Sequence, residues 1–405
     1  MNIKENIHKF QQDFDRLTQN IAKVIKGKND VIQNILTSMV ANGHIMLLDY
    51  PGTGKTVLVK AISASLQCDF KRIQFTPDVL PMDITGSMVF NMQSRDFEFQ
   101  KGPVFCNLLL ADEFNPLLNR CIAGLYSPGS TYKLVTALHA IENQKFNKNK
   151  KFLCSGHVSF GNRKFHCWKK EGHGYVNLHE AIEKSCDCYF YNLAKTVKID
   201  DLAKFSNLFS YGQRTGIDIP NELKGIMPDR KWKIKNRNEK WQKGETLNTV
   251  IGQGFMLSTP LQITLMTARI ATGKKIIPTI ITNKKEFENL NISNENLEFI
   301  KSSMFSVVNN STGTAFNSKL RGNYKMAGKT GTSQVRRISL EEREDGVIKN
   351  EELNYKLRDH SIFTCFAPFD KPKYSLSVIA EHMGSGSKVA APIAKRIMEL
   401  ALNKY

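Results

Sequence analysis

Ser127-Pro128-Gly129-Ser130-Thr131-Tyr132-Lys133 runs directly into the apolar segment Leu134–Ile141. The Pro-Gly dipeptide predicts a turn, and the apolar residues after it predict a helix that starts close to Lys133. Ser130 and Lys133 stand three residues apart at the start of this helix, so both side chains lie on one face and the amine can reach the hydroxyl. A serine hydroxyl attacks an amide only when a base takes its proton, and a neutral, buried lysine can be that base. The stretch therefore predicts a nucleophilic serine with an adjacent base.

Two further motifs lie downstream, Ser185-Cys186-Asp187 and Lys329-Thr330-Gly331-Thr332. Taken singly, each motif has an ordinary explanation, because Ser-x-x-Lys is frequent by chance, Ser-x-Asp often caps a helix and Lys-Thr-Gly often ends a strand. Taken together, their order and wide spacing match the three motifs of serine acyl enzymes that bind penicillin. We therefore predict acyl transfer through a covalent serine ester.

The composition favours two domains of different charge. The chain has 405 residues, of which 41% are hydrophobic, and a formal net charge of +19 from 57 basic and 38 acidic side chains. A chain of this length commonly folds as two domains. Basic and acidic residues balance over 1–115, so the whole excess lies in 116–405. The basic segments 145–151 and 231–240 lack the aromatic pattern of a nucleic-acid-binding surface. We expect solvated surface there, or a face toward an anionic envelope or membrane, and no nucleic-acid partner.

The sequence contains no apolar run of about 18 residues, and residues 1–19 are polar with charges of both signs. A membrane-spanning helix and a cleaved signal peptide are therefore not expected. As written, the sequence predicts a cytoplasmic chain. Its eight cysteines do not indicate a disulfide scaffold in a protein of this length.

Residues 44–56 have the pattern of a phosphate-binding loop. A buried strand is predicted at 44–48, followed by Pro51-Gly52-Thr53-Gly54-Lys55-Thr56 and a helix from Val57, and two helices are predicted within 8–41. A glycine-rich turn between strand and helix lets backbone N–H groups approach a phosphate, while Lys55 reaches its outer oxygens and Thr56 holds Mg²⁺. A second predicted strand, 107–111, ends in Asp112-Glu113, which suit a metal contact and the activation of water. The segment therefore predicts a site for ATP and Mg²⁺.

Residues 26–115 resemble a MoxR-type AAA+ ATPase. The stretches that carry the resemblance are PGTGKT (51–56), RIQFTPDVLPMDITGS (72–87), KGPVF (101–105) and LLLADE (108–113). The resemblance stops at Asn115, before the two further strands, polar sensor, arginine finger and helical lid that such ATPases need. Asp49 also stands at the first glycine of the loop. The resemblance therefore implies a truncated P-loop segment with vestigial binding of ATP and Mg²⁺, and a sheet with a gap at its centre.

Residues 116–405 resemble the transpeptidase domain of elongation-type class B penicillin-binding proteins, the penicillin-binding protein 2 family. The stretches that carry this resemblance are NPLLNRCIAGLYSPGSTYK (115–133), WKKEGHG (168–174), SCDCYFYN (185–192), YGQRTGIDIP (211–220), IGQGFMLSTPLQ (251–262), AGKTGTSQV (327–335) and RDHSIFTCFAP (358–368). The family implies a five-stranded antiparallel sheet with helices on both faces and an all-helical lobe, with the active site between them. It also implies peptidoglycan stem peptides as substrates, β-lactams as inhibitors, cell-wall elongation proteins as partners, and work in the periplasm at the inner membrane.

Carried over position by position, the resemblance implies a role for each residue of the first two motifs. Ser130 is the acylated nucleophile, and Lys133 is its base. Ser185 and Asp187 move protons during the reaction. Asp187 stands where many relatives have asparagine.

The third motif binds the substrate by the same resemblance. Lys329 and Thr330, which precede Gly331, hold the substrate carboxylate. The backbone N–H groups of Ser130 and Thr332 form the oxyanion hole. The segment Gly252-Gln253-Gly254 is interpreted as a plain turn before a helix, without a catalytic part.

Cys154, Cys167, His173 and Cys186 form a candidate metal site. Three thiolates and one imidazole are a ligand set that a structural, tetrahedral zinc ion prefers. Their spacing lacks a close Cys-x-x-Cys pair, so buried free thiols are the alternative. Some relatives in the resembled family carry zinc in this region, with ligands that match Cys167, His173 and Cys186. Because Cys186 lies between Ser185 and Asp187, a metal here would hold that motif in place.

The two resemblances predict a chain of α/β and α+β class in two parts, a truncated P-loop segment over 1–115 and a transpeptidase domain over 116–405. The transpeptidase family also implies a membrane helix and a pedestal domain before the nucleophile, and the ATPase-like segment stands in their place. We therefore interpret the chain as a join of two gene fragments with its seam at 113–118. The alternatives are a MoxR-like ATPase or chaperone that acts on partner proteins, and a fusion product without function.

Overall fold

The computed structural model divides into two compact units, Met1–Leu117 and Leu118–Tyr405, close to the predicted change at residue 115. The residues that the structure describes are 3–41, 43–45, 47, 54–74, 81–91, 96–112, 119–143, 146–280, 286–336, 342, 348 and 350–404. Within these residues, every helix is too short or too polar to span a lipid bilayer.

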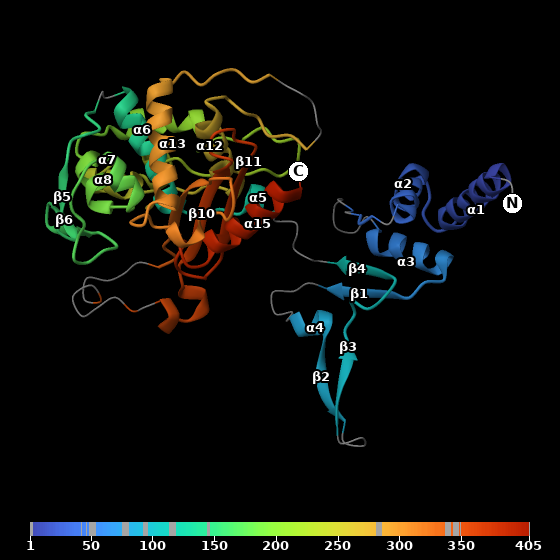
Figure 1. The fold of residues 1–405 in the computed structure, drawn as a ribbon. Helices are drawn as coiled ribbons and strands as arrows, with labels where there is room; N and C mark the ends of the chain where they lie inside the picture. Colours follow the sequence, from blue (N-terminus) through green and yellow to red (C-terminus); the bar gives the residue numbers. More distant parts are fainter. Residues whose placement is uncertain are drawn as a thin grey trace. The chain divides into compact units, whose positions relative to one another are not determined.

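Three helices form the apolar core of the first unit, drawn in blue in Figure 1: α1 (Ile3–Ala22), α2 (Asn29–Val40) and α3 (Lys55–Leu66). The first two confirm the pair of helices predicted within 8–41. Apolar side chains of all three helices meet in one cluster, which contains Ile21, Ile32, Ile35, Leu36, Leu58 and Ile62. This cluster is the hydrophobic core of the unit.

Two pairs of strands complete the first unit. β1 (Phe70–Gln74) and β4 (Leu108–Asp112) run parallel, with Phe70 opposite Leu108. β4 confirms the strand predicted at 107–111. β2 (Gly86–Asn91) and β3 (Asp96–Lys101) form an antiparallel hairpin that follows the short helix α4 (Pro81–Thr85).

The strand predicted at 44–48 is not formed by those of its residues that the structure describes. His44, Ile45 and Leu47 belong to neither a helix nor a strand, and Ile45 is 38% exposed. A strand needs a neighbour to pair its backbone N–H and C=O groups. Among the described residues, β4 pairs with β1 alone. The prediction was wrong for these residues because it rested on apolar character alone.

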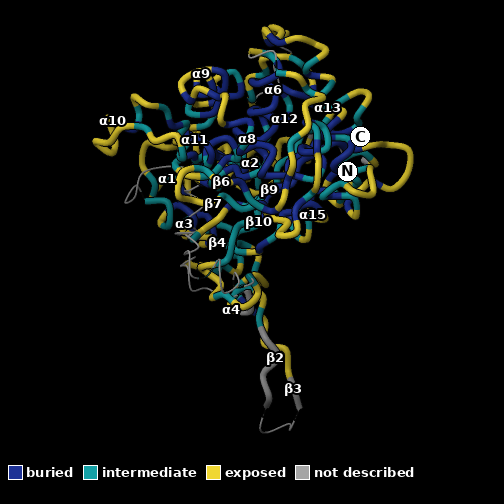
Figure 2. Tube along the Cα trace, turned by 90° about the vertical axis from the view of Figure 1, so that its left-hand side faces the viewer, coloured by how far each residue is buried: buried dark blue, intermediate teal, exposed yellow. Residues whose placement is uncertain are grey.

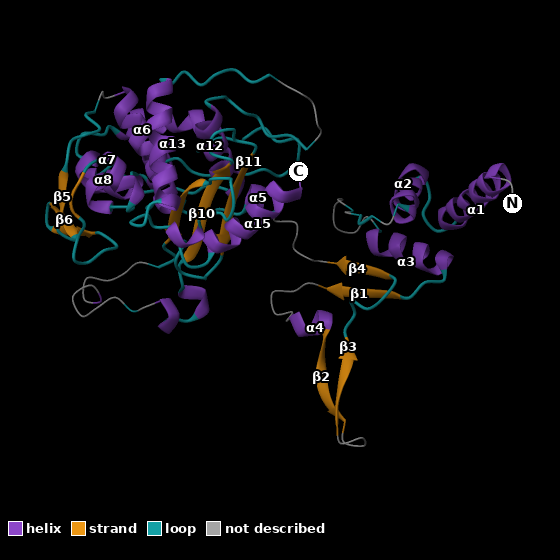
Figure 3. Ribbon diagram, in the orientation of Figure 1, coloured by secondary structure: helices purple, strands orange, loops and turns teal. Residues whose placement is uncertain are grey.

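The second unit is built on a three-stranded antiparallel sheet in the order β11–β10–β9, shown in orange in Figure 3. β9 (Ala327–Ser333) pairs with β10 (His360–Ala367), and β10 pairs with β11 (Tyr374–Ala380). The family resemblance implied five strands. The described residues therefore form a narrower sheet than expected.

The other described strands of this unit are short and pair among themselves. β5 (Phe152–Cys154) pairs with β8 (Gly174–Val176), and β6 (His157–Phe160) pairs with β7 (Arg163–His166). None of them joins the three-stranded sheet, which is why it stays at three strands among the described residues.

Helices cover both faces of the sheet, as the resemblance implied. α12 (Pro260–Thr272) contacts β10 through a 2.6 Å hydrogen bond between the hydroxyls of Thr267 and Thr364. α15 (Ala390–Lys404) contacts it through the Ala390 N–H, which donates to Ser361 Oγ at 3.0 Å. Ser361 and Thr364 are three residues apart on one strand, so their side chains point to opposite faces. The sheet therefore lies between α12 and α15.

α6 (Lys133–Asn143) is the central helix of the second unit and confirms the helix predicted after Lys133. Every residue from Leu134 to Ala140 is buried, and a helix that is buried all round belongs to a core rather than a surface. Figure 2 shows buried residues concentrated around α6, α8 and α12. α13 (Asn294–Asn309) packs against α6 and also against β9. The helical lobe and the sheet thus share one core.

Short helical elements complete the second unit. Their bounds are α5 (Arg120–Ala123), α7 (Leu178–Glu183), α8 (Asp187–Ala194), α9 (Ile199–Ser206), α10 (Arg230–Arg237) and α11 (Lys243–Thr249), with the 3-10 turns η1 (Gly129–Tyr132), η2 (Asn207–Phe209), η3 (Phe316–Ser318), η4 (Asn350–Glu352) and η5 (Tyr355–Leu357).

Candidate active site

Ser130 lies where a tight turn meets the central helix. It belongs to η1, and Lys133 is the first residue of α6. The turn depends on Gly129, whose φ is +55° and whose position leaves no room for a side chain, because a Cβ there would lie 2.5 Å from Thr332 O on β9. Ser130 lines a cavity of about 1730 Å³, together with Ser185 and Thr332. The turn therefore brings residues of all three motifs to one cavity.

The amine of Lys133 is buried and fully engaged. Nζ donates to Asp187 Oδ1 at 2.7 Å, to Ser185 O at 2.9 Å and to Ser185 Oγ at 3.4 Å, and the side chain is fully excluded from solvent. These three acceptors match the three N–H groups of an ammonium. Ser130 Oγ makes no hydrogen bond to any residue that the structure describes. The contact that the spacing predicts between Ser130 and Lys133 is not formed as a hydrogen bond, because Lys133 binds the junction between α7 and α8 instead.

Ser185 occupies that junction in an unusual backbone conformation. Its φ is +54°, in the left-handed region that a residue other than glycine adopts at a cost of about 1 kcal/mol or more. α7 ends before it and α8 begins after it, so the positive φ turns the chain between the two helices. Ser185 Oγ accepts hydrogen bonds from Lys329 Nζ at 2.7 Å and from Lys133 Nζ at 3.4 Å. One hydroxyl thus connects the first and third motifs.

The third motif lies on β9. Lys329 is fully buried, and its amine also donates to Thr330 O at 3.1 Å. The Thr330 hydroxyl lies 2.8 Å from that of Thr314. Gly331 faces the turn that carries the nucleophile, since a Cβ on it would lie 3.1 Å from Pro128 O. β9 and η1 therefore pack closely enough to form the two sides of one site.

The charges in the site favour binding of an anion. Lys133 and Lys329 are both buried near the buried carboxylate of Asp187, which Lys133 contacts. Burial lowers the pKa of Lys329 well below its usual value, and the charge of Lys133 lowers it further. Burial raises the pKa of Asp187, and the Lys133 ammonium opposes this effect. A ligand with a carboxylate would relieve the repulsion between the lysines.

Three residues of the site were not predicted from the sequence. Gln253 Nε2 donates to Thr332 O at 3.0 Å, although its segment was interpreted as a plain turn. Thr314 contacts Thr330 as described above. The backbone N–H of Trp168 donates to Asp187 Oδ2, and its indole N–H donates to Ser185 O, both at 3.1 Å. The glycines on either side of Gln253 were the only sequence signal for a constrained backbone there.

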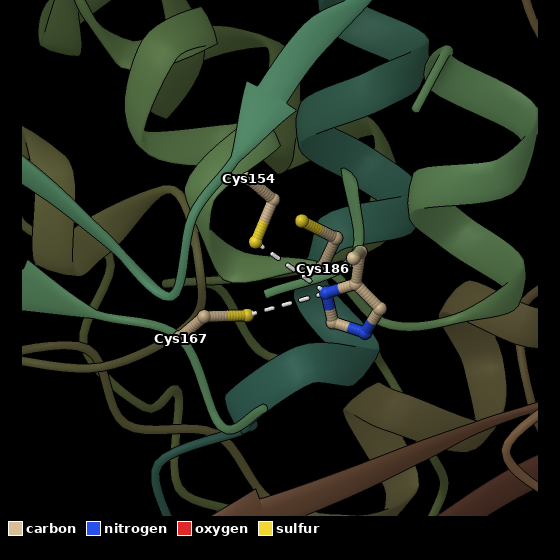
Figure 4. A group of neighbouring side chains, drawn as sticks. Cys154, Cys167 and Cys186 are labelled. Carbon is tan, nitrogen blue, oxygen red and sulfur yellow. Dashed lines mark hydrogen bonds between the residues drawn. The ribbon is translucent and has the colours of Figure 1, made fainter. Parts of the chain in front are cut away.

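The structure brings Cys154, Cys167, His173 and Cys186 together, and Figure 4 shows the three cysteine side chains pointing toward one another. One ligand atom from each of the four residues lies within 4.8 Å of the others. His173 Nδ1 is 3.5 Å from Cys154 Sγ and 3.6 Å from Cys167 Sγ. Ligands at about 2.0–2.3 Å from a tetrahedral zinc ion lie roughly 3.5–3.8 Å apart. The two distances from His173 Nδ1 therefore match the ligand spacing of a zinc site.

The local fold explains how distant cysteines meet. Cys154 ends β5 and Cys186 precedes α8, and the His173 N–H donates to Cys154 O at 3.1 Å. The cysteines are reduced, and hydrogen bonds with Cys186 and Cys188 lower the pKa of the Cys167 thiol. The Cys167 hydrogen bond and burial raise the pKa of Cys186. Three cysteine sulfurs and one imidazole nitrogen are a ligand set that zinc prefers.

The residues predicted to bind ATP and Mg²⁺ lie only partly within the described chain. Gly52, Thr53 and Glu113 lie outside it. Gly54 precedes α3 with a φ of +86°, and Lys55 and Thr56 are the first two residues of that helix. Asp112 ends β4. These positions leave the nucleotide site as a prediction.

A family model described as the penicillin binding protein transpeptidase domain matches residues 83–399. The chain belongs to this family. The matched range includes all three motifs of the cavity and the three strands β9, β10 and β11. It begins within the first compact unit, upstream of the predicted domain boundary at 116. The penicillin-binding transpeptidase fold is therefore established for the second unit, whereas the match does not reach the P-loop residues 51–56.

Curated members of the transpeptidase family are similar over most of the chain. Peptidoglycan D,D-transpeptidase MrdA of Acinetobacter baumannii is 36% identical over 296 residues, which are 69% of this chain and 43% of that protein. MrdA of Haemophilus influenzae is 35% identical over 311 residues, or 73% of this chain and 47% of that protein. The chain thus spans less than half the length of these curated relatives.

Solved structures of penicillin-binding proteins are also similar to this chain. The complex between penicillin-binding protein PBP2 and MreC from Helicobacter pylori has a TM-score of 0.64 and 34% identity, and covers 76% of this chain and 56% of that chain. Pseudomonas aeruginosa PBP2 in complex with WCK 5153 has a TM-score of 0.62 and 32% identity, with coverage of 76% and 70%. A separate match of 110 residues at 44% identity, 26% of this chain and 34% of that protein, is to the uncharacterized protein YeaC of Bacillus subtilis. It names no ATPase, so the MoxR resemblance stays a prediction.

Proposed function

We propose that the Leu118–Tyr405 unit is a serine D,D-transpeptidase that cross-links peptidoglycan stem peptides. The observation that carries the proposal is the meeting of the three motifs at one hydroxyl. Lys133 and Lys329 both donate to Ser185 Oγ, beside the cavity that Ser130 lines. The similarity to relatives named as peptidoglycan D,D-transpeptidases supports the choice of reaction.

In the first step, Ser130 Oγ attacks the carbonyl carbon of the amide in a terminal D-Ala-D-Ala. An ester C–O bond forms, the amide C–N bond breaks, and the terminal D-alanine leaves as an amine. Lys133, in its neutral form, takes the proton of the hydroxyl, and Ser185 passes a proton to the leaving nitrogen. The backbone N–H groups of Ser130 and Thr332 stabilise the oxyanion.

In the second step, the amine of another stem peptide attacks the ester. A new amide bond forms, the ester C–O bond breaks, and Ser130 regains its proton. Lys329 and Thr330 act before this, in the first step, where they bind the terminal carboxylate that leaves with the D-alanine. β-Lactams mimic the D-Ala-D-Ala amide and leave a stable ester on Ser130.

The cluster of Cys154, Cys167, His173 and Cys186 holds a structural zinc ion in this proposal. A bound zinc ion would link the end of β5, the segment before β8 and the start of α8 through these four residues. Cys186 directly follows Ser185 and directly precedes α8. Fixing Cys186 in the cluster therefore also fixes the backbone of Ser185, whose φ is positive.

The proposed partner of this unit is inferred from a solved relative. The H. pylori relative was solved in complex with MreC, so a cell-wall elongation protein of that kind is the proposed partner of this unit. Peptidoglycan is cross-linked outside the inner membrane, and the proposed place of action is therefore the periplasmic side. The relatives lend no support to the cytoplasmic location expected from the sequence.

Labelling with a fluorescent penicillin tests the reaction. The folded full-length chain should form a covalent adduct that survives denaturation, and Ser130→Ala should form none. Ser127→Ala is the matched control, because Ser127 lines the same cavity without a proposed role in bond formation. Equal labelling of the wild type and Ser130→Ala, or no labelling of the folded wild type, would refute the proposed function.

A further inference from the structure

The dipeptide Gly252-Gln253 makes hydrogen bonds to Gly129, which precedes Ser130, and to Thr332, the two sides of the proposed oxyanion hole. Gly252 O accepts a hydrogen bond of 2.9 Å from the N–H of Gly129, the residue before Ser130. Gln253 Nε2 donates to Thr332 O at 3.0 Å. One dipeptide therefore connects the turn that carries the nucleophile to the strand that carries the second oxyanion donor.

The backbone of this dipeptide is tightly constrained. Gly252 has a φ of +71°, and a Cβ on it would lie 2.3 Å from Gly129 O. Its N–H donates to Thr249 O at 2.9 Å, and the N–H of Gln253 donates to Asn248 O at 3.0 Å. Because the main chain is fixed on both sides, the Gln253 side chain has a defined direction into the cavity that it lines.

The hydrogen bond to Thr332 O reveals the orientation of Thr332. The N–H and C=O groups of one strand residue point to the same side of the strand. Thr332 O and N both face the turn before Ser130, since a Cβ on Gly129 would lie 2.5 Å from the oxygen and 3.2 Å from the nitrogen. The oxyanion donor therefore has a carbonyl oxygen beside it, whose partial negative charge repels an oxyanion.

We propose that Gln253 is a positioning residue of the oxyanion hole. Its amide N–H group binds Thr332 O, keeps the Thr332 N–H directed into the cavity, and offsets the repulsion between the carbonyl and the developing negative charge. The role rests on the proposed acyl transfer at Ser130. It replaces the interpretation of residues 252–254 as a plain turn.

Acylation kinetics of Gln253→Met test this role. The variant keeps the length of the side chain and removes the donor. Losing an oxyanion donor itself costs about 10²–10³ in rate, so losing its positioning bond should lower the limiting acylation rate by about 10–100-fold. The concentration of fluorescent penicillin that gives half-maximal rate should change little. Gln213→Met is the matched control, because Gln213 is exposed and outside the cavity.

The pH dependence of acylation by Gln253→Glu separates a positioning role from a merely structural one, because a structural role would not depend on pH. Its carboxylate cannot donate, but the protonated carboxyl can. The acylation rate of this variant relative to wild type should therefore rise as the pH is lowered from about 8 toward about 5, nearer the usual pKa of a glutamic acid, about 4.3. Thermal unfolding of each full-length variant confirms that the compared proteins are folded.

The outcomes separate the two proposals. If the wild type is acylated and Gln253→Met is acylated at the same limiting rate, the positioning role is overturned and the transpeptidase function stands. A rate loss in Gln253→Glu that does not change with pH also overturns it. If the folded wild type is not acylated at all, the proposed function fails and the role of Gln253 fails with it.

Discussion

Lys133 Nζ lies 2.7 Å from Asp187 Oδ1, and the lysine side chain is fully shielded from water. This ion pair joins the first residue of the central helix α6 to the first residue of α8. A buried charge without its partner costs several kcal/mol, so each of the two residues depends on the other. The contact that positions the base of the proposed reaction therefore also links α6 to α8.

Replacing one partner of this pair should cost more stability than the pair itself contributes. Lys133→Ala leaves Asp187 as an unpaired buried charge and should lower the free energy of unfolding by about 3–5 kcal/mol. Lys133→Ala combined with Asp187→Asn should recover part of that loss. Urea unfolding of the wild type, both single variants and the double variant gives a double-mutant cycle, from which the interaction energy of the two side chains is obtained. Strictly additive losses would show that the two side chains do not interact.

Lys329→Ala should chiefly weaken the capture of ligands that carry a carboxylate. The concentration of penicillin at half-maximal acylation rate should rise by more than the limiting rate falls, because the ammonium binds the ligand before the ester forms. Lys329 has a lowered pKa, so it loses its charge as the pH rises past a value below the usual 10.5 of a lysine. Capture by the wild type should weaken at that pH. A ligand ester without the carboxylate is the control, and an equal loss for both ligands would contradict the role.

Zinc should be present at one ion per chain and should be needed for stability. Elemental analysis after purification without a metal-affinity tag measures it. Cys167→Ser should lose the metal, whereas Cys121→Ser should keep it, since Cys121 is exposed and outside the cluster. Chelation should lower the unfolding temperature and slow acylation, because Cys186 adjoins Ser185. Absence of zinc under reducing conditions would return these residues to buried free thiols.

Tyrosines buried behind the nucleophile should make the second unit sensitive to alkali. Burial raises the pKa of Tyr132 and Tyr211 above the usual value of 10.0, and their rings lie 5.3 Å apart. Above pH 10, the unfolded chain releases these protons while the folded chain keeps them, so the free energy of unfolding falls as the pH rises. Absorbance at 295 nm should show these tyrosines ionising together with unfolding. Ionisation near pH 10 in a chain that stays folded would contradict their burial.

The first unit should show no measurable ATPase activity. An arginine finger is worth about 10³–10⁵ in rate, and the sequence supplies none after the P-loop. Among the described residues, β4, which ends at the predicted metal ligand Asp112, pairs only with β1. Steady-state phosphate release from the full chain measures turnover, with Lys55→Ala as the comparison. Turnover that disappears in Lys55→Ala would restore the ATPase alternative.

The sequence was sufficient to predict elements that depend on their own residues. The apolar residues after Lys133 predicted α6, and β4 was visible as an apolar run before Asp112. The strand predicted at 44–48 is not formed by His44, Ile45 and Leu47, the residues of it that the structure describes, because strand formation depends on a partner that the apolar pattern does not reveal. The family resemblance implied the sheet with helices on both faces, although with more strands than the described residues form.

The site was less predictable than the fold. Spacing places Ser130 and Lys133 on adjacent turns, but the direction of the amine depends on Asp187, more than fifty residues away. The positive φ of Ser185 has no signal in its sequence, since serine is rarely found in that conformation. The role of Gln253 follows from a backbone oxygen on a distant strand. Such features depend on tertiary contacts that one-dimensional patterns do not contain.

β11 pairs with β10 on one edge, and none of the described residues pairs with its other edge. Its seven residues, Tyr374–Ala380, include no charged residue and no proline, two of the features that prevent edge strands from joining each other. The positive charge of the second unit keeps copies apart at low ionic strength. At about 0.1 M salt the screening length is about 10 Å, so that repulsion weakens. Solubility of this chain should therefore fall as salt is added, with concentrated solutions precipitating through β11.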